Sequence, residues 1–110
     1  MNVRLYVWQR GTAALMAPLV LVHLAVIFYA TRQGLTAADI LGRTRGSITW
    51  GLFYGVFVLA AAIHASIGLR NILVEWVPGL RSRAAALIST AFGAVLVALG
   101  ARAVAAVVLG

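Results

Sequence analysis

Two histidines interrupt long apolar stretches of the sequence, and the spacing around one of them favours the binding of a bulky ligand. Ala60, His64 and Gly68 follow one another at intervals of four, so they share one face if the segment is helical. A flat ligand held by the imidazole needs small residues above and below it, and alanine and glycine leave that room. Polar side chains return between Arg70 and Glu75. An apolar slot with one basic ligand and a polar rim suits a haem better than a soluble substrate.

The alternative for His64 is a histidine that hydrogen-bonds to a neighbouring helix and serves packing alone. Ionisable side chains are costly inside a membrane, so each one is a candidate functional residue. Histidine acts both as a metal ligand and as a hydrogen-bonding group between helices. The residues taken by themselves leave the two roles open.

His23 lies in an earlier apolar run, between Leu19 and Ile27, which are larger than the neighbours of His64. A macrocycle has less room there, so packing or a hydrogen bond is favoured over ligation of a haem iron. The cost of placing a histidine at this depth keeps iron binding by His23 as the weaker hypothesis.

The composition is that of a membrane protein and excludes several kinds of chemistry. Of the 110 residues, 64% are hydrophobic, and the only acidic ones are Asp39 and Glu75. The net charge of +7 comes from arginines at the ends of apolar runs, which is typical of anchors at lipid headgroups and does not indicate nucleic-acid binding. Without cysteine, the chain provides no disulfide and no thiolate for an iron–sulfur cluster.

Three apolar segments, 11–30, 48–73 and 84–109, are long enough to cross a bilayer. They predict an all-α integral membrane protein, a single domain over residues 1–110, with three transmembrane helices in an up-down bundle. Pro18 lies within the first segment and is expected to bend that helix.

The segments outside the spans carry interface and turn signals. Tyr6 and Trp8, in the lead-in to the first span, suit the level of the lipid headgroups. In the connector 31–47, the spacing of Thr36 and Asp39 is a capping signal for a short interfacial helix.

The third span contains small residues and follows a tight turn. Pro78–Gly79 is a strong helix breaker between the second and third spans. Ser89, Gly93 and Gly100 are expected to be positions of close helix packing.

The arginines are divided almost evenly between the two ends of the predicted bundle. One end holds Arg4, Arg10, Arg70, Arg81 and Arg83, and the other holds Arg32, Arg43, Arg45 and Arg102. The small excess at the first end predicts a cytoplasmic N-terminus. We interpret Arg43–Arg45 as solvated, without chemistry of its own.

The two histidines are expected at different depths in the membrane. His64 precedes Arg70 by about 9 Å of helix, whereas His23 follows Arg10 by about 20 Å. They are therefore not expected to bind one iron together. The second ligand of a haem on His64 would come from another chain.

Two separated motifs resemble the cytochrome b anchor subunit of succinate:quinone oxidoreductase, the Complex II family of succinate dehydrogenases and fumarate reductases. In that family an arginine and small residues lie near the first span, and Gln9-Arg10-Gly11-Thr12 is similar. The family's second span carries His-x-x-x-Gly-x-Arg-His-x-x-x-Asp. The corresponding residues here are His64, Gly68, Arg70, Asn71 and Glu75. The three-span layout and the length agree, so the likeness covers nearly the whole chain.

The resemblance implies a site for haem b and a site for quinone. The family's haem ligand corresponds to His64, with Gly68 and Arg70 in the same motif. Its arginine near a haem propionate and the quinone pocket corresponds to Arg10. Tyr6 or Trp8 would then line the quinone pocket.

The sequence departs from the family pattern at three positions. Asn71 stands where the family often has a second histidine, which puts a propionate contact there in doubt. Tyr6 stands where a serine is frequent, so the quinone pocket is expected to be remodelled. His23 has no counterpart in single-haem anchors and would fit a relative with two haems.

The resemblance also implies a role within a larger assembly of the tricarboxylic acid cycle. A flavoprotein subunit and an iron–sulfur subunit would oxidise succinate. This chain and a second membrane anchor subunit would hold them at the bacterial inner membrane and help to pass electrons to quinone, so the chain would not be catalytic alone.

Two alternatives from other classes are a small multi-pass transporter and a cofactor-free membrane adaptor. Proton-coupled transport needs a carboxylate within the membrane, and neither Asp39 nor Glu75 lies at mid-span. In an adaptor, both histidines would be packing residues.

Overall fold

The computed structural model describes residues 2–110, and every regular element in this range is a helix. The helices are α1 (Val3–Gln33), α2 (Ala37–Thr44), α3 (Ile48–Trp76) and α4 (Ser82–Val108). The three long helices are each long and apolar enough to cross a membrane. The all-α fold with three membrane helices, predicted from the sequence, is confirmed.

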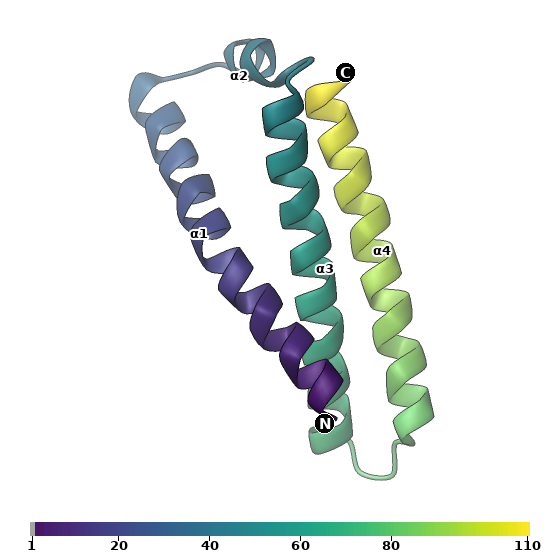
Figure 1. Cartoon of the computed structure of the whole chain (residues 1–110). Helices are drawn as coiled ribbons and strands as arrows, with labels where there is room; N and C mark the ends of the chain where they lie inside the picture. Colours follow the sequence, from purple (N-terminus) through teal and green to yellow (C-terminus); the bar gives the residue numbers. More distant parts are fainter. Residues whose placement is uncertain (1) are drawn as a thin grey trace.

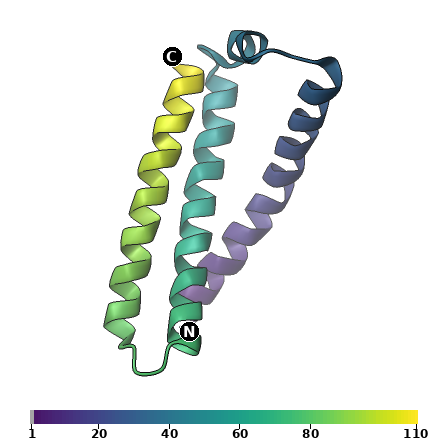
Figure 2. The same cartoon turned by 180° about the vertical axis from the view of Figure 1, so that it is seen from behind.

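The long helices alternate in direction, but they are not equally close together (Figure 1). α3 and α4 lie side by side, whereas α1 crosses α3 near the N-terminus and then diverges from it. The short helix α2 lies between the separated ends of α1 and α3, as the reverse view also shows (Figure 2). We call the region around Gln9 and His64 the crossing end, and the region around His23 and α2 the open end.

α1 contains both the predicted lead-in and the first predicted span in one continuous helix. Asn2 caps its start by accepting a hydrogen bond from the Leu5 N–H at 2.8 Å. Pro18 lies inside the helix without ending it, which membrane helices tolerate. Gly34 follows with a φ of 65°, a left-handed conformation that glycine adopts without strain.

α2 begins at the capping signal that the sequence predicts, and the capping box is confirmed. The Asp39 N–H donates to the Thr36 hydroxyl at 3.1 Å, and the Thr36 N–H donates to the Asp39 carboxylate at 2.9 Å. The backbone bond from Thr36, assisted by its hydroxyl, holds the pKa of the Asp39 carboxyl below its ordinary value.

Two hydrogen bonds tie the segment after α2 to the end of α4. The buried Thr44 hydroxyl donates to the Val107 carbonyl at 2.7 Å. The Gly46 N–H donates to the Val108 carbonyl at 2.6 Å. These bonds attach the end of α2 and the residue that follows its cap to the end of α4.

Small residues fill the interface between α3 and α4. Ala62, Ala85 and Ser89 are almost completely buried, and the Ser66 hydroxyl donates to the Ser89 carbonyl at 2.8 Å. Small side chains allow two backbones to approach closely, which favours helix association where no water drives it.

Two glycines of α4 mark the closest approach to α3. A Cβ placed on Gly93 would lie 3.1 Å from the Ser66 side chain, and one placed on Gly100 would overlap the side chain of Val58. Together with the buried Ser89, these contacts confirm the predicted positions of close packing.

Large apolar side chains point away from the helix interfaces. The following are more than half exposed: Leu21, Phe28, Leu52, Leu59, Leu87 and Leu99. An exterior of this kind is unfavourable in water and suits contact with lipid tails or with other membrane helices.

Candidate functional site

His64 lies at the crossing end, where the first turns of α1 pack against α3. Its Nδ1 atom lies 3.2 Å from the Gln9 carbonyl oxygen and 3.4 Å from the Thr12 hydroxyl oxygen. Both partners come from α1, so the histidine of one membrane helix is oriented by the backbone of another.

The contacts of His64 select one tautomer. The Gln9 carbonyl can only accept a hydrogen bond. The Thr12 hydroxyl directs its hydrogen to the Trp8 carbonyl at 2.7 Å and the Gln9 carbonyl at 3.1 Å, so it presents a lone pair to the imidazole. Because both neighbours are acceptors, Nδ1 carries the ring hydrogen of a neutral His64. Its Nε2 then carries the lone pair.

The Nε2 atom of His64 has no hydrogen-bond partner among residues 2–110. No buried polar side-chain atom in this range lacks a partner, so Nε2 is accessible at the surface of the chain. An imidazole that donates through Nδ1 to a backbone carbonyl and leaves Nε2 free has the usual arrangement of a metal-binding histidine. The arrangement of His64 therefore fits a residue that would hold a haem iron.

Gln9 also occupies part of the space that the sequence analysis assigned to a ligand. Its side-chain oxygen accepts a hydrogen bond from Asn71 at 3.2 Å, and its side-chain nitrogen lies 3.9 Å from a Cβ placed on Gly68. Ala60 is only 3% exposed. The small residues around His64 thus admit the close approach of neighbouring parts of this chain, and the accessible side of the imidazole is the one that Nε2 faces.

Arg10, Tyr6 and Trp8 lie on α1 beside this contact. The Arg10 Nε atom donates to the Tyr6 hydroxyl at 3.2 Å, and the guanidinium lies 5.4 Å from the centre of the Tyr6 ring. Successive helical residues point about 100° apart, so Arg10 projects away from the α3 side that Gln9 faces. All three predicted quinone-site residues are exposed, and the hydrogen-bonding partners of His64 among the described residues are Gln9 and Thr12 instead.

Arg70 points toward α4 and not toward the histidine. One of its terminal nitrogens donates to the Ser82 hydroxyl at 3.4 Å, which joins the end of α3 to the start of α4. Six residues separate Arg70 from His64, so the two side chains leave α3 on different faces. The predicted residues are therefore brought to one end of the bundle but not into a single contact network.

His23 lies at the open end and has a different environment. Its Nδ1 atom lies 3.2 Å from the Tyr54 hydroxyl, and its ring meets those of Tyr54 and Phe57 edge to face at 5.6 and 5.5 Å. A phenol both donates and accepts hydrogen bonds, so this contact does not select a tautomer. His23 also lines two cavities, of about 420 and 410 Å³.

The structure keeps the two histidines apart. The partners of His23 on α3, Tyr54 and Phe57, precede His64 by ten and seven residues, which is about 10–15 Å along the helix. No group of three or more metal-binding side chains occurs among residues 2–110. His64 and His23 are therefore too far apart to bind one metal ion together.

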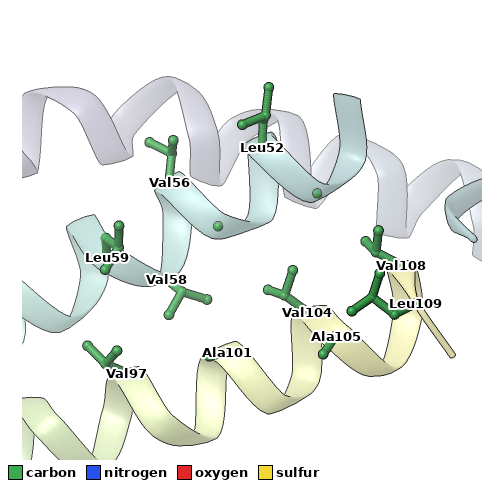
Figure 3. A pocket seen from close by; sticks show the side chains of 12 residues that line it. Leu52, Val56, Val58, Leu59, Val97, Ala101, Val104, Ala105, Val108 and Leu109 are labelled. Atoms are coloured by element: carbon green, nitrogen blue, oxygen red, sulfur yellow. The ribbon is translucent and has the colours of Figure 1, made fainter. Parts of the chain in front are cut away.

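A further cavity is lined by neither histidine. About 560 Å³ in volume, it lies between α3 and α4, and Val58 and Val104 point into the gap (Figure 3). Its lining consists of glycine, alanine, valine and leucine, with no side chain that could bind, protonate or reduce a substrate. We assign it no chemical role.

Sequence reasoning missed two residues of the His64 contact. Gln9 and Thr12 were noted only as neighbours of Arg10 in the first motif. The signal was their spacing, because positions three apart share a helix face and both are polar within an apolar segment.

The sequence matches the family described as Succinate dehydrogenase/Fumarate reductase transmembrane subunit over residues 1–101. The chain belongs to this family. No curated protein and no solved structure matches it. Membership extends over α1, α2 and α3 and most of α4, so both the crossing end and the open end are parts of the family's fold.

Proposed function

We propose that this chain is a membrane anchor subunit of succinate:quinone oxidoreductase that binds haem b through His64 and forms part of the quinone site. The observation that carries the proposal is the 3.2 Å contact of the His64 Nδ1 atom with the Gln9 carbonyl oxygen, which leaves Nε2 accessible. His64 would hold the iron on one side, and a second subunit would hold it on the other. Bound haem b supplies a one-electron carrier at this point.

Arg10 and its neighbours would bind the quinone or a haem propionate. The bond to Tyr6 uses the Nε hydrogen of Arg10 and leaves the terminal nitrogens available. A guanidinium fork directed at an oxygen stabilises negative charge through charge-assisted hydrogen bonds. Trp8, half-exposed on the same helical turn, would supply an apolar wall.

The distribution of arginines supports a cytoplasmic N-terminus for the chain, which we place in a bacterial inner membrane. The N-terminus and the α3–α4 turn lie at the same end of the bundle (Figure 1). That end carries the slight excess of positive charge, which is retained on the cytoplasmic side. A flavoprotein and an iron–sulfur subunit would dock there, and a second anchor subunit would cover part of the apolar exterior.

Replacement of each histidine tests the proposal. The complex is purified through a tag on this chain, and reduced-minus-oxidised spectra are recorded for wild type, His64→Ala and His23→Ala. We expect His64→Ala to lose or strongly perturb the b-type haem band and His23→Ala to keep it. The same purification should recover a second small membrane subunit and two soluble subunits.

Flavin content and succinate oxidation with an artificial dye control for assembly in each variant. Unchanged haem in His64→Ala, or haem lost only in His23→Ala, would overturn the ligand assignment. A stable, haem-loaded chain recovered without partners would contradict the proposed role as an anchor subunit.

A further inference from the structure

The cavity of about 420 Å³ at the open end lies between α1 and α3, beneath α2. Most of its wall is aliphatic or aromatic. Lining residues include Val26, Ile27, Ala30, Leu35, Ile40 and Trp50. Water occupies ~30 Å³ per molecule and a methylene group about as much, so the cavity has room for roughly 14 such groups. That is the size of much of one acyl chain.

Arg43 is the only arginine, lysine or carboxylate among the described residues that line this cavity. It lies in the last turn of α2, and its guanidinium is 5.6 Å from the centre of the Tyr29 ring on α1. Tyr29 lines the cavity as well. A cation is therefore held at the rim of an apolar cavity by contact between two helices.

The charged groups at the same end of the bundle as Arg43 are two further arginines and the Asp39 carboxylate, which interacts electrostatically with Arg43. Arg32 lies in the last turn of α1, and Arg45 caps the end of α2. The acidic residue of this helix, Asp39, has its carboxylate engaged by the Thr36 N–H at 2.9 Å. The end of the bundle that carries α2 thus has an excess of cations at the level where lipid headgroups lie.

The depth of the cavity corresponds to one leaflet of the bilayer. It extends along α1 from the level of Ala30 to that of His23, about 11 Å, and Arg43 lies above it. Half of a hydrocarbon core of ~30 Å is about 15 Å. A molecule that fits has an anionic group at the interface and a hydrocarbon chain of leaflet length below it.

We propose that this cavity binds an anionic phospholipid, with its phosphate at Arg43 and one acyl chain between α1 and α3. A flat redox ligand is the competing occupant, because His23 and Tyr54 lie in the cavity wall. Their contact of 3.2 Å engages Nδ1 of His23 and the Tyr54 hydroxyl with each other. The positive charge of Arg43 lies at the rim of the cavity. This position suits a phosphate at the membrane surface better than a ring system bound deep in the cavity.

The test uses the whole complex, purified with its partner chains and reconstituted in nanodiscs of phosphatidylcholine with or without phosphatidylglycerol. Tightly bound lipid is counted by native mass spectrometry after detergent washing. Arg43→Gln removes the charge, and Ala30→Leu fills the cavity without changing charge. Arg45→Gln is the matched control, because Arg45 belongs to the same connector but does not line the cavity.

We expect Arg43→Gln to lower retention of phosphatidylglycerol about fivefold, since loss of one basic contact to an anionic headgroup costs roughly 1 kcal/mol and Arg43 is the arginine that lines the cavity. Ala30→Leu should also lower retention, because the larger side chain takes space that the acyl chain would occupy. Arg45→Gln should retain wild-type amounts, and Arg43→Lys an intermediate amount. Dye-linked succinate oxidation and the haem band verify assembly, and Arg43→Lys with Ala30→Leu carry the test if Arg43→Gln does not assemble.

Equal retention by all variants overturns the proposal. It is also overturned by equal retention of phosphatidylcholine and phosphatidylglycerol in wild type. A quinone or a second haem that is recovered with wild type and lost in Ala30→Leu would assign the cavity to a redox ligand instead. The lipid count does not depend on the haem band, so this proposal can fail while the proposed function stands.

Discussion

The same two helices, α1 and α3, meet in opposite ways at the two ends of the bundle. At the crossing end, Gln9 and Thr12 approach His64 closely enough for hydrogen bonds to its imidazole. At the open end, the helices diverge, a cavity lies between them, and the contact from His23 to Tyr54 joins two side chains. At the crossing end, His64 contacts a backbone carbonyl. At the open end, His23 contacts a side-chain hydroxyl that can rotate.

This difference shows why two histidines in one apolar chain are not equivalent. A backbone carbonyl has a fixed direction and a single hydrogen-bonding role, so it sets which nitrogen of His64 is available to a ligand. A phenol accepts or donates, so it leaves the tautomer of His23 undetermined. The close helix crossing fixes which nitrogen of His64 is exposed, and the divergence of the helices at the open end leaves a cavity.

The largest effect is expected at the crossing end, from Arg10→Lys. A headgroup anchor tolerates this change, because both side chains reach water on apolar stems. A forked contact to a quinone oxygen or a haem propionate does not tolerate the change to lysine, because lysine lacks the planar guanidinium. Losing a charge-assisted hydrogen bond costs roughly 1.5–3 kcal/mol. Quinone reduction by the complex should fall on the order of ten- to a hundredfold.

Two controls accompany the Arg10 variant. Succinate oxidation with an artificial dye should be unchanged, because it draws electrons from the soluble arm. Arg32→Lys, at the open end, should leave quinone reduction unaffected. Equal losses in the quinone and dye assays would return Arg10 to the class of interfacial anchors.

The next largest effect is expected at the interface between α3 and α4. Gly100→Leu tests the packing of this interface. A Cβ at this position already overlaps Val58, whose β-branched side chain has few rotamers with which to move aside. Overpacking of this kind costs about 1–3 kcal/mol. We expect a lower thermal midpoint for the purified complex. Gly55→Leu is the matched control, because no atom lies within 4 Å of its Cβ position.

A smaller effect is expected when one hydroxyl is removed beside each histidine. Thr12→Val takes an acceptor away from Nδ1 of His64 but leaves the Gln9 carbonyl in place, so haem retention should fall by about tenfold or less. Tyr54→Phe removes the partner of His23 and should leave haem unaffected. Equal haem retention by Thr12→Val and Tyr54→Phe would show that the Thr12 hydroxyl does not influence haem binding.

The smallest effect is expected from Asp39→Asn, in the cap of α2. The folded pKa of Asp39 is lowered by its bond from Thr36, so the carboxylate stabilises α2 fully above its unfolded pKa of ~3.9. That contribution is lost as pH falls through the lowered folded value. At pH 7, the amides of α2 should exchange faster in the variant than in wild type, by a factor of about five or less. The difference should vanish at a pH below the lowered folded pKa of Asp39.

Much of the fold could be predicted from the sequence because its signals are local. Apolar runs of sufficient length set the three spans, and the breaker at Pro78–Gly79 separates the last two. The spacing of Thr36 and Asp39 located the start of α2. Each of these features depends on residues a few positions apart, so one sequence is enough to reveal it.

The pairing of helix faces could not be predicted in the same way. The long helices are apolar on most sides, so no polar stripe marks which face meets a neighbour. The partner of His64 is a backbone atom of Gln9, which side-chain identity does not reveal. Arg43 is exposed, which agrees with its interpretation as a solvated charge. Its contact with Tyr29 could not be predicted, because that contact depends on the angle between α1 and α3.

The bonds from the connector to α4 have a consequence for the order of events during synthesis. Thr44 and its acceptor, Val107, are 63 residues apart in the chain. At ~5–20 residues per second, α2 leaves the ribosome roughly 3–13 s before the carbonyl that will hold it. During that interval α2 has its capping box but lacks the bonds to α4, which form only after α4 has been made.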